Sequence, residues 1–568
     1  MNTSQRKEAE KLLHQGNWQA ALQTFLEIVN NESSPDPEIL NIIGMLQAKI
    51  GKYEEALISI NHALQLKSNY PPFYNNKGNI LLHLNQIDAA ISAYQQSIKI
   101  QPKYPIGYSN LGRCYYLQNK LIASKKAFEQ ALQLDAGLTD ANYNYAVLLI
   151  KLGKYPKALN LLKKTLDLNP RYAPAQGQIA QIYLQQQDYD KAIFHLSKRI
   201  EIQPSHVDSW FHLGLCHLEL NQFTPAKQAL EKTVSLEPNH IEAYHYLGTV
   251  HLQLGDREKA LNYFLRQIEI QSNSSTYYNI GVLLMYLERH AEAIEYLKLA
   301  QETEPGYLPT HLNLGSIYLK LGAVPEAINH YQLANKIKPN DPEIMHILNA
   351  LTQTKTPEKA PTEYLQHLFD QYASHYDKHL TEYLHYRVPQ QLHKLIYQEI
   401  EPPEEKWKVL DLGCGTGLCG ELFKEFADEL IGIDLSTEMI EAARRKKIYD
   451  HLIVGDISEK MINFQQIDLI LAADVFTYLG DLENLFDKAS LILKEGGLFA
   501  FSVEKGGPEP YKLQQSIRYA HARDYLEQLI HQYQFTNLRF DNIMLRKQKG
   551  HPVEGYLVLL QKGITVNC

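Results

Sequence analysis

Four aspartates at the ends of short apolar runs are the residues in this sequence best suited to bind a ligand. They are Asp411, Asp434, Asp456 and Asp474. A carboxylate accepts hydrogen bonds from ligand hydroxyl and amino groups. Short apolar runs that alternate with helical stretches are typical of an α/β fold with a mainly parallel sheet, and such sheets bind ligands at the carboxyl ends of their strands. We therefore predict that the four carboxylates lie at one ligand site.

The first of these runs leads into a turn with three glycines, Gly413, Gly415 and Gly417. Glycines at a strand-to-helix turn let the backbone approach a ligand closely. A dinucleotide-binding turn has the spacing G-x-G-x-x-G, but Leu418 occupies the final position here. The turn therefore indicates a ligand other than a dinucleotide.

The Asp-Leu-Gly-x-Gly-x-Gly turn resembles motif I of the class I S-adenosylmethionine-dependent methyltransferases. The next run ends in Gly432-Ile433-Asp434 and continues as Leu435-Ser436-Thr437-Glu438-Met439, which is typical of that family. The resemblance implies S-adenosyl-L-methionine as cofactor, with Asp411 at its amino end, Asp434 at the ribose and Asp456 near the adenine. The cofactor-binding residues that it implies are Tyr372, Tyr376, Asp411, Gly413, Gly415, Gly417, Asp434, Leu435, Asp456, Ile457 and Asp474.

The segment 369–380 resembles the N-terminal helix with which bacterial repeat-containing methyltransferases cover the cofactor. Tyr372 and Tyr376 are four residues apart, which predicts that both lie on one face of a helix. An aromatic lid of this kind would exclude water and stabilise a sulfonium through its π-face. The alternative is that the two tyrosines pack as core residues.

Methyl transfer from a cationic sulfur depends mainly on the placement of the reacting atoms, so few catalytic side chains are required. His375 and His521 are the candidates for a general base, because imidazole titrates near neutral pH. A structural role is the alternative for both. The run after the fourth strand, Asp474-Val475-Phe476-Thr477-Tyr478, is not the Asn-Pro-Pro-Tyr type associated with nucleobase amines, which disfavours DNA modification.

A 34-residue period fills the first 340 residues, and two columns of small residues mark it. The first column is Ala21, Ala56, Ala90, Ser124, Ala158, Ala192, Ala226, Ala260, Ala293 and Ala327; the second, twelve residues earlier, is Gly44, Gly78, Gly112, Ala146, Ala180, Gly214, Gly248, Gly281 and Gly315. Helices cross closely only where side chains are small, so each unit is predicted to be a helical hairpin. The pattern resembles ten tetratricopeptide repeats, with 341–353 as a final capping helix.

A column of asparagines stands two residues before the second column of small residues. It consists of Asn76, Asn110, Asn144, Asn279 and Asn313, with His212 and Tyr246 interrupting it. In repeat arrays that this one resembles, such side chains line a groove and pair with the backbone of an extended peptide, since an amide both donates and accepts. The alternative is that asparagine only suits a solvated helix face.

The predicted fold is an α-solenoid of tetratricopeptide repeats over 1–353 and an α/β, Rossmann-like, seven-stranded methyltransferase domain over 363–568. Residues 354–362 are polar with two prolines, which indicates a linker that fixes no single geometry. Strands are expected near 407–412, 428–434, 451–455, 467–473, 498–503, 537–545 and 555–562.

The composition disfavours several classes of partner. The 56 Lys and Arg against 64 Asp and Glu give a net charge of −8, which offers no general attraction to nucleic acid. We expect no secretory signal and no membrane span. The five cysteines are scattered and lack metal-like pairing, so we expect no metal site and a cytoplasmic location. The oligomeric state stays open.

Three functions fit these observations. The first is a methyltransferase that uses the repeat array to recruit a protein or a protein-bound acceptor. The second is a methyltransferase for a small or carrier-linked carboxylate, in which the repeats serve assembly. The third is a repeat scaffold with a non-catalytic cofactor-binding domain.

Overall fold

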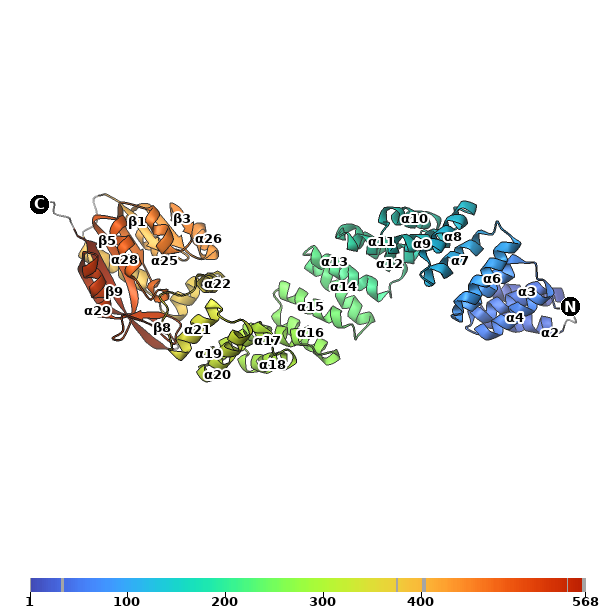
Figure 1. Cartoon of the computed structure of the whole chain (residues 1–568), viewed down its shortest axis with the longest axis horizontal. Helices are drawn as coiled ribbons and strands as arrows, with labels where there is room; N and C mark the ends of the chain where they lie inside the picture. Colours follow the sequence, from blue (N-terminus) through green and yellow to red (C-terminus); the bar gives the residue numbers. More distant parts are fainter. Residues whose placement is uncertain (1, 32–34, 374–375, 401–404, 549, 564–568) are drawn as a thin grey trace. The chain divides into compact units, whose positions relative to one another are not determined.

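The chain forms two compact units, which separate between Ser272 and Asn273. The computed structural model describes residues 2–31, 35–373, 376–400, 405–548 and 550–563. Within the described residues, the first unit contains eight helical hairpins, and the second contains two more hairpins, the further helices of the chain and the β-sheet (Figure 1).

Each 34-residue repeat forms a pair of helices, as the sequence predicts. The first unit contains α1 (Asn2–His14), α2 (Trp18–Asn30), α3 (Pro37–Lys49), α4 (Tyr53–Leu66), α5 (Pro71–His83), α6 (Ile87–Ile100), α7 (Pro105–Leu117), α8 (Leu121–Leu134), α9 (Thr139–Lys151), α10 (Tyr155–Leu168), α11 (Ala173–Gln185), α12 (Tyr189–Ile202), α13 (Val207–Glu219), α14 (Phe223–Leu236), α15 (Ile241–Gln253) and α16 (Arg257–Ile270). The second unit continues with α17 (Ser274–Tyr286), α18 (His290–Thr303), α19 (Leu308–Leu321), α20 (Val324–Ile337) and the capping helix α21 (Pro342–Thr352).

Close helix crossing explains both columns of small residues. Every residue of the first column, from Ala21 to Ala327, is fully buried. In the second column, a Cβ atom on Gly248 would lie 2.4 Å from the ring of Phe264 on the partner helix. A Cβ on Gly78 would lie 2.5 Å from the ring of Tyr94 in the same way. The glycines therefore let an aromatic side chain of the second helix seat directly against the backbone of the first.

The second unit contains one mixed sheet of nine strands. They are β1 (Trp407–Leu412), β2 (Ala427–Asp434), β3 (His451–Val454), β4 (Ile467–Ala472), β5 (Leu493–Lys505), β6 (Tyr511–Leu513), β7 (Tyr519–His521), β8 (Phe535–Gln548) and β9 (His551–Lys562). Strands β3, β2, β1, β4 and β5 are parallel, and antiparallel β9 and then β8 complete the sheet beyond β5. All seven expected strands are present. The short strands β6 and β7, which branch from the end of β5, were not expected.

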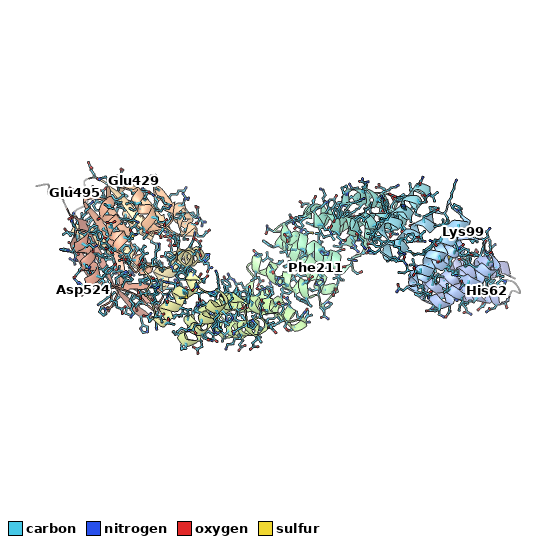
Figure 2. The ribbon with its side chains drawn as sticks, viewed as in Figure 1. His62, Lys99, Phe211, Glu429, Glu495 and Asp524 are labelled. Atoms are coloured by element: carbon cyan, nitrogen blue, oxygen red, sulfur yellow. The ribbon has the colours of Figure 1, made fainter. Side chains whose placement is uncertain are left out.

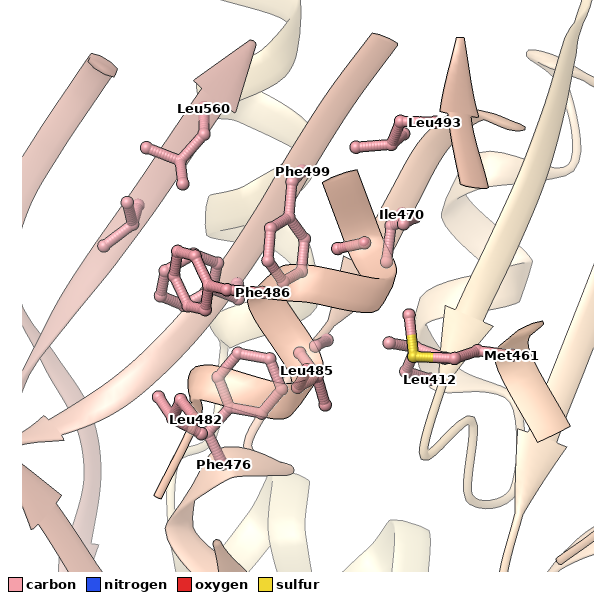
Figure 3. Close-up of a cluster of buried hydrophobic side chains, with 14 of the residues drawn as sticks. Leu412, Met461, Ile470, Phe476, Leu482, Leu485, Phe486, Leu493, Phe499 and Leu560 are labelled. Carbon is pink, nitrogen blue, oxygen red and sulfur yellow. The ribbon is translucent and has the colours of Figure 1, made fainter. Parts of the chain in front are cut away.

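Helices and helical turns cover the sheet and connect its strands. They are α22 (Thr362–Tyr372), α23 (Tyr376–Lys378), the π-helical turn His379–Tyr383, α24 (Val388–Glu399), α25 (Leu418–Phe423), α26 (Thr437–Lys446), α27 (Ile457–Lys460), the 3₁₀ turns Met461–Asn463 and Phe476–Tyr478, α28 (Glu483–Ile492) and α29 (Arg523–Gln532). The core between α28 and the sheet is aromatic. Figure 3 shows Phe486 of α28 beside Phe499 of β5, with ring centroids 5.5 Å apart.

The segment 354–362 is held against the sheet domain rather than left as a free tether. Gly480 and Asp481 donate backbone hydrogen bonds to the carbonyl of Glu358, and Ala360 donates one to the carbonyl of Tyr478. At the end of the repeats, the side-chain amide of Gln353 donates to the carbonyl of Leu513 at 2.9 Å. The last repeats and the sheet are therefore joined by contacts on both sides of this segment.

The surfaces of both units carry exposed charged side chains, such as Lys99 on α6 and Asp524 on α29 (Figure 2). Among the helices of the described ranges, none combines the length and the apolar character that crossing a membrane would require.

We predict that Gly248→Ala destabilises the first unit by about 1–3 kcal/mol, because the added methyl group would overlap the ring of Phe264. Hydrogen exchange of α15 and α16, together with urea denaturation, measures the effect. Gly306→Ala is the matched control, since a Cβ there meets nothing within 4 Å. Equal protection of the two variants would contradict the close crossing.

Candidate active site

The glycine turn after β1 is shaped by close packing. Gly413 has φ +64°, and a Cβ on it would lie 2.4 Å from Cγ2 of Val475, which follows β4. Gly415 has φ +53° and donates its backbone N–H to Oδ2 of Asp434 at 2.8 Å. Left-handed backbone at two positions explains why glycine is needed there. The turn is thereby tied to the carboxyl end of β2.

Asp434 ends β2 and presents a carboxylate to a cavity. Its Oδ1 accepts from the backbone N–H of Ser436 at 2.9 Å, and its Oδ2 accepts from Gly415. Each carboxylate oxygen can accept a further hydrogen bond. Burial raises the pKa of Asp434, and the backbone donors act in the opposite direction. The residue can therefore take a pair of ligand hydroxyls while its own orientation is fixed.

A first cavity lies over this turn. Eight of the residues implied by the resemblance line it: Tyr376, Gly413, Gly415, Asp434, Leu435, Asp456, Ile457 and Asp474. Apolar side chains, among them Met439, Val475 and Leu479, complete its wall. The carboxylates can accept hydrogen bonds from the hydroxyl and amino groups of a nucleoside, and the apolar wall can pack against its flat ring. The residues of this cavity therefore fit S-adenosyl-L-methionine.

Asp456 lies at the edge of this cavity with its side chain already engaged. It caps α27 by accepting from the backbone N–H of Ser458 at 2.8 Å, and it accepts from Nζ of Lys359 at 3.1 Å. The pKa of Asp456 is lowered: burial raises it, but the donors from Ser458 and Lys359 outweigh burial. Asp456 is therefore anionic at neutral pH.

Asp411 and Gly417 lie apart from the first cavity. Asp411 is 1% exposed, lines a smaller adjoining cavity under the glycine turn, and accepts from the hydroxyl of Tyr449 at 2.6 Å. Gly417 has φ +93° and precedes α25. Burial raises the pKa of Asp411 to about 7, although the Tyr449 hydroxyl acts in the opposite direction. These positions make Asp411 a support of the turn.

The two tyrosines of the predicted lid lie beside the cavities, but they do not share one helix. Helix α22 ends at Tyr372 and α23 begins at Tyr376, and the two rings meet edge to face with centroids 5.2 Å apart. Asp370 hydrogen-bonds to the hydroxyl of Ser436, and Asp377 accepts from Nζ of Lys446 at 3.0 Å. The lid is therefore attached to α26, the helix that follows the Asp434 strand.

A second cavity adjoins the first and shares four lining residues with it. The shared residues are Phe369, Tyr376, Asp474 and Tyr478. The second cavity is also lined by Arg518, Arg546, His379, Tyr372 and, from repeat helix α17, Tyr286. A repeat helix thus contributes to the lining of the second cavity.

Charged groups line the wall that the two cavities share. Arg546 of β8 donates to Oδ1 of Asp474 at 2.9 Å and also to Glu504 of β5. Asp474 has φ +59°, and its backbone N–H donates to the hydroxyl of Ser502. Arg518, which precedes β7, lies with Nη1 3.6 Å from Oδ2 of Asp474.

Of the two histidines expected as bases, only His521 lies within the described residues, and His375 lies outside them. His521 is fully buried on β7, with Nε2 3.0 Å from the carbonyl oxygen of Gly480, and burial lowers its pKa to about 4. It lines neither cavity. These contacts argue against His521 as a general base.

The sequence analysis proposed only Tyr372, Tyr376 and Asp474 among the residues of the second cavity, and it missed others, among them His379, Tyr478, Arg518 and Arg546. His379 could have been found, because it continues the spacing of Tyr372 and Tyr376, and its Nδ1 hydrogen-bonds to the hydroxyl of Tyr372. Arg518 stands three residues before His521 in a segment that was already considered. No local signal marks Arg546, which follows Asp474 by 72 residues.

The asparagine column lies on the first helices of the hairpins. Most successive first helices contact one another within each unit. Asn76 donates to Oδ1 of Asn41 at 2.8 Å, Asn110 to Oδ1 of Asn75 at 2.9 Å, and Asn313 to the hydroxyl of Tyr278 at 3.1 Å. In the described residues, no side-chain hydrogen bond involves Asn144 or Asn279. Part of the column therefore links neighbouring repeats, and part remains available to a ligand.

Family comparisons agree with this architecture. A model described as "Methyltransferase domain" matches residues 410–501. Models described as "Tetratricopeptide repeat" or "TPR repeat" match 37–70, 78–119, 118–182, 151–213, 183–247 and 284–351, and one described as "Anaphase-promoting complex, cyclosome, subunit 3" matches 221–300. The chain therefore carries tetratricopeptide repeats followed by a methyltransferase domain.

Curated relatives match a part of the chain. A ubiquinone biosynthesis O-methyltransferase of Nitrobacter winogradskyi is 34% identical over 99 residues, 17% of this chain and 38% of that protein. A malonyl-[acyl-carrier protein] O-methyltransferase 2 of Ilyobacter polytropus is 34% identical over 124 residues, 21% of this chain and 47% of that protein. The chain thus spans less than half the length of these relatives.

Solved structures match the repeats. YrrB, described as a TPR protein with an unusual peptide-binding site, is 22% identical, with a TM-score of 0.29 over 33% of this chain and 96% of that one. A thermophilic TPR protein of Thermus thermophilus is 20% identical, with a TM-score of 0.30 over 32% of this chain and 100% of that one.

The raised pKa of Asp411 predicts a pH-dependent stability. In the unfolded chain Asp411 ionises near 3.8, whereas in the fold it holds its proton to about 7. Its stabilising contribution is thus complete below about pH 4 and is lost as the pH rises to about 7, at about 1.4 kcal/mol per pH unit. Urea denaturation across this range should show wild type losing stability relative to Asp411→Asn. A constant difference between the two proteins would contradict the shift.

Proposed function

We propose that this chain, which carries tetratricopeptide repeats and a methyltransferase domain, is an S-adenosyl-L-methionine-dependent methyltransferase whose repeat array recruits a protein or protein-bound acceptor. One observation carries the proposal. The cavity that contains the motif residues adjoins a second cavity, and Tyr286 of repeat helix α17 forms part of the wall of the second cavity.

The cofactor supplies a methyl group on a cationic sulfur. This chain supplies the placement that an in-line displacement needs. Asp434 would accept the ribose hydroxyls, and Leu435 and Ile457 would pack on the adenine. Tyr376 lines both cavities, so it is suited to exclude water at their junction.

The repeats offer a surface on which an extended peptide could bind. A cavity in the first unit is lined by α11, α12 and α13, and it contains Gln178, Gln181, His212 and Arg199. The buried Nε of Arg199 has no hydrogen-bond acceptor among the described residues. Together with Asn144 of the same unit, these side chains supply donors for peptide carbonyl groups. The curated relatives are named O-methyltransferases, which favours oxygen as the acceptor atom.

The first test is calorimetric titration of S-adenosyl-L-methionine into the full-length protein. We expect Asp434→Asn to weaken binding by about 10- to 100-fold, since it removes a charged acceptor of the ribose hydroxyls. Asp428→Asn, an exposed change on the same strand, should bind as wild type does. If wild type does not bind the cofactor, the methyltransferase proposal fails and the scaffold function takes its place.

The second test follows transfer of labelled methyl groups to the proteins of a soluble extract. We expect Asn144→Ala to reduce labelling by about 3- to 10-fold at low extract concentration, because one side-chain hydrogen bond to the acceptor is lost. Cofactor affinity should stay unchanged. Asn262→Ala, an exposed asparagine on second helix α16, is the matched control. Labelling that is equal in all three proteins would assign the repeats to assembly instead.

A further inference from the structure

The guanidinium groups of the second cavity differ in how their charges are compensated. Arg546 is 2% exposed and donates to two carboxylates, those of Asp474 and Glu504. Both of its terminal nitrogens are thus engaged with protein groups. Arg546 therefore has a structural role, because its two ion pairs fix the side chains that form the wall of the cavity.

Arg518 is placed on the same wall but keeps an unused donor. Its Nη1 is buried and finds no hydrogen-bond acceptor among the described residues, since Oδ2 of Asp474 is 3.6 Å away. Its guanidinium carbon lies 5.6 Å from the ring centroid of Tyr478, a contact that restrains the plane of the group. Buried N–H donors in proteins are almost always paired. Arg518 lines the second cavity, so an acceptor atom of a ligand bound there is suited to take this donor.

We propose that Arg518 binds a carboxylate of the methyl acceptor, so that the enzyme transfers its methyl group to a carboxylate oxygen. This inference rests on the proposed function and names its substrate class. A guanidinium pairs with a carboxylate through two parallel hydrogen bonds. Leu368, Leu380 and Leu384 line the same cavity, so the body of the acceptor next to the carboxylate is apolar.

The summed charge of the groups around the second cavity is compatible with an acceptor that carries one carboxylate. Arg518 and Arg546 carry two positive charges, and Asp474 and Glu504 carry two negative ones. An incoming carboxylate adds one negative charge, which the sulfonium of the cofactor in the adjoining cavity offsets. A phosphate dianion would leave a net negative charge in this partly buried place, which is costly.

The reaction balances without a general base. The acceptor oxygen forms a bond to the methyl carbon while the carbon–sulfur bond breaks, and the electron pair of that bond stays on sulfur. A carboxylate and a sulfonium become a neutral ester and a neutral thioether, and no proton moves. A hydroxyl acceptor would need a base, for which His379 is the imidazole that lines the cavity.

The experiment uses full-length protein, labelled S-adenosyl-L-methionine and soluble extract. A methyl ester releases its label as volatile methanol in mild alkali, whereas methyl ethers and methylamines do not. We expect alkali-labile label from wild type. Arg518→Gln should reduce its transfer by about 10- to 100-fold, the loss expected for charge-assisted hydrogen bonds, with cofactor affinity unchanged. Arg523→Gln, an exposed arginine paired with Glu527, should behave as wild type.

A binding measurement tests whether Arg518 binds a carboxylate, and it does not require methyl transfer. Octanoate is titrated into the protein in the presence of S-adenosylhomocysteine, with octanamide as the uncharged control. We expect octanoate to bind wild type better than octanamide does, and this preference to disappear in Arg518→Gln and to persist in Arg523→Gln. Alkali-stable label, full transfer by Arg518→Gln, or equal binding of acid and amide would overturn the carboxylate assignment. Failure of the cofactor itself to bind would instead refute the proposed function.

Discussion

The ligand edge of the sheet depends on one buried guanidinium, that of Arg546. It joins β8 to Asp474 after β4 and to Glu504 on β5. Two carboxylates buried this deeply repel each other and lose their hydration, so without the cation at least one would be protonated or displaced. Asp474 lines both cavities and has a left-handed backbone conformation. The arginine therefore fixes the wall at which cofactor and acceptor would meet.

The capping helix that follows the last repeat packs against the sheet domain. His346 of the capping helix α21 is buried with its ring centroid 5.5 Å from that of Tyr364 and 6.0 Å from that of Tyr519. Burial lowers its pKa to about 4, so it is neutral and acts there as a packing residue. Such a contact between a repeat helix, the lid helix and strand β7 would not form across a free linker. The presence of Tyr286 in the second cavity is a consequence of this rigid junction.

The sequence was sufficient to predict features that depend on residues close together in the chain. The 34-residue period predicts the ten hairpins, and the positions of Asp434 and Asp456 at strand ends predict that both line one cavity. It was insufficient to predict short elements and contacts between segments that are far apart in the chain. Strands β6 and β7 have three residues each, too few for a periodic signal. Arg546 stands in a strand whose sequence gives no sign that its guanidinium lies beside Asp474. His521 looked suitable as a base because sequence alone does not show that its ring is enclosed by Gly480, Tyr511 and Tyr525.

The lid couples the two cavities through the groups that anchor it. Asp370 contacts Ser436, the N-cap of α26, and Asp377 contacts Thr416 in the glycine turn. Both anchors belong to the loops that would bind the cofactor, whereas Phe369, Tyr372 and Tyr376 form the wall of the second cavity. A ligand that orders the turn and the α26 cap therefore also orders the wall that an acceptor contacts.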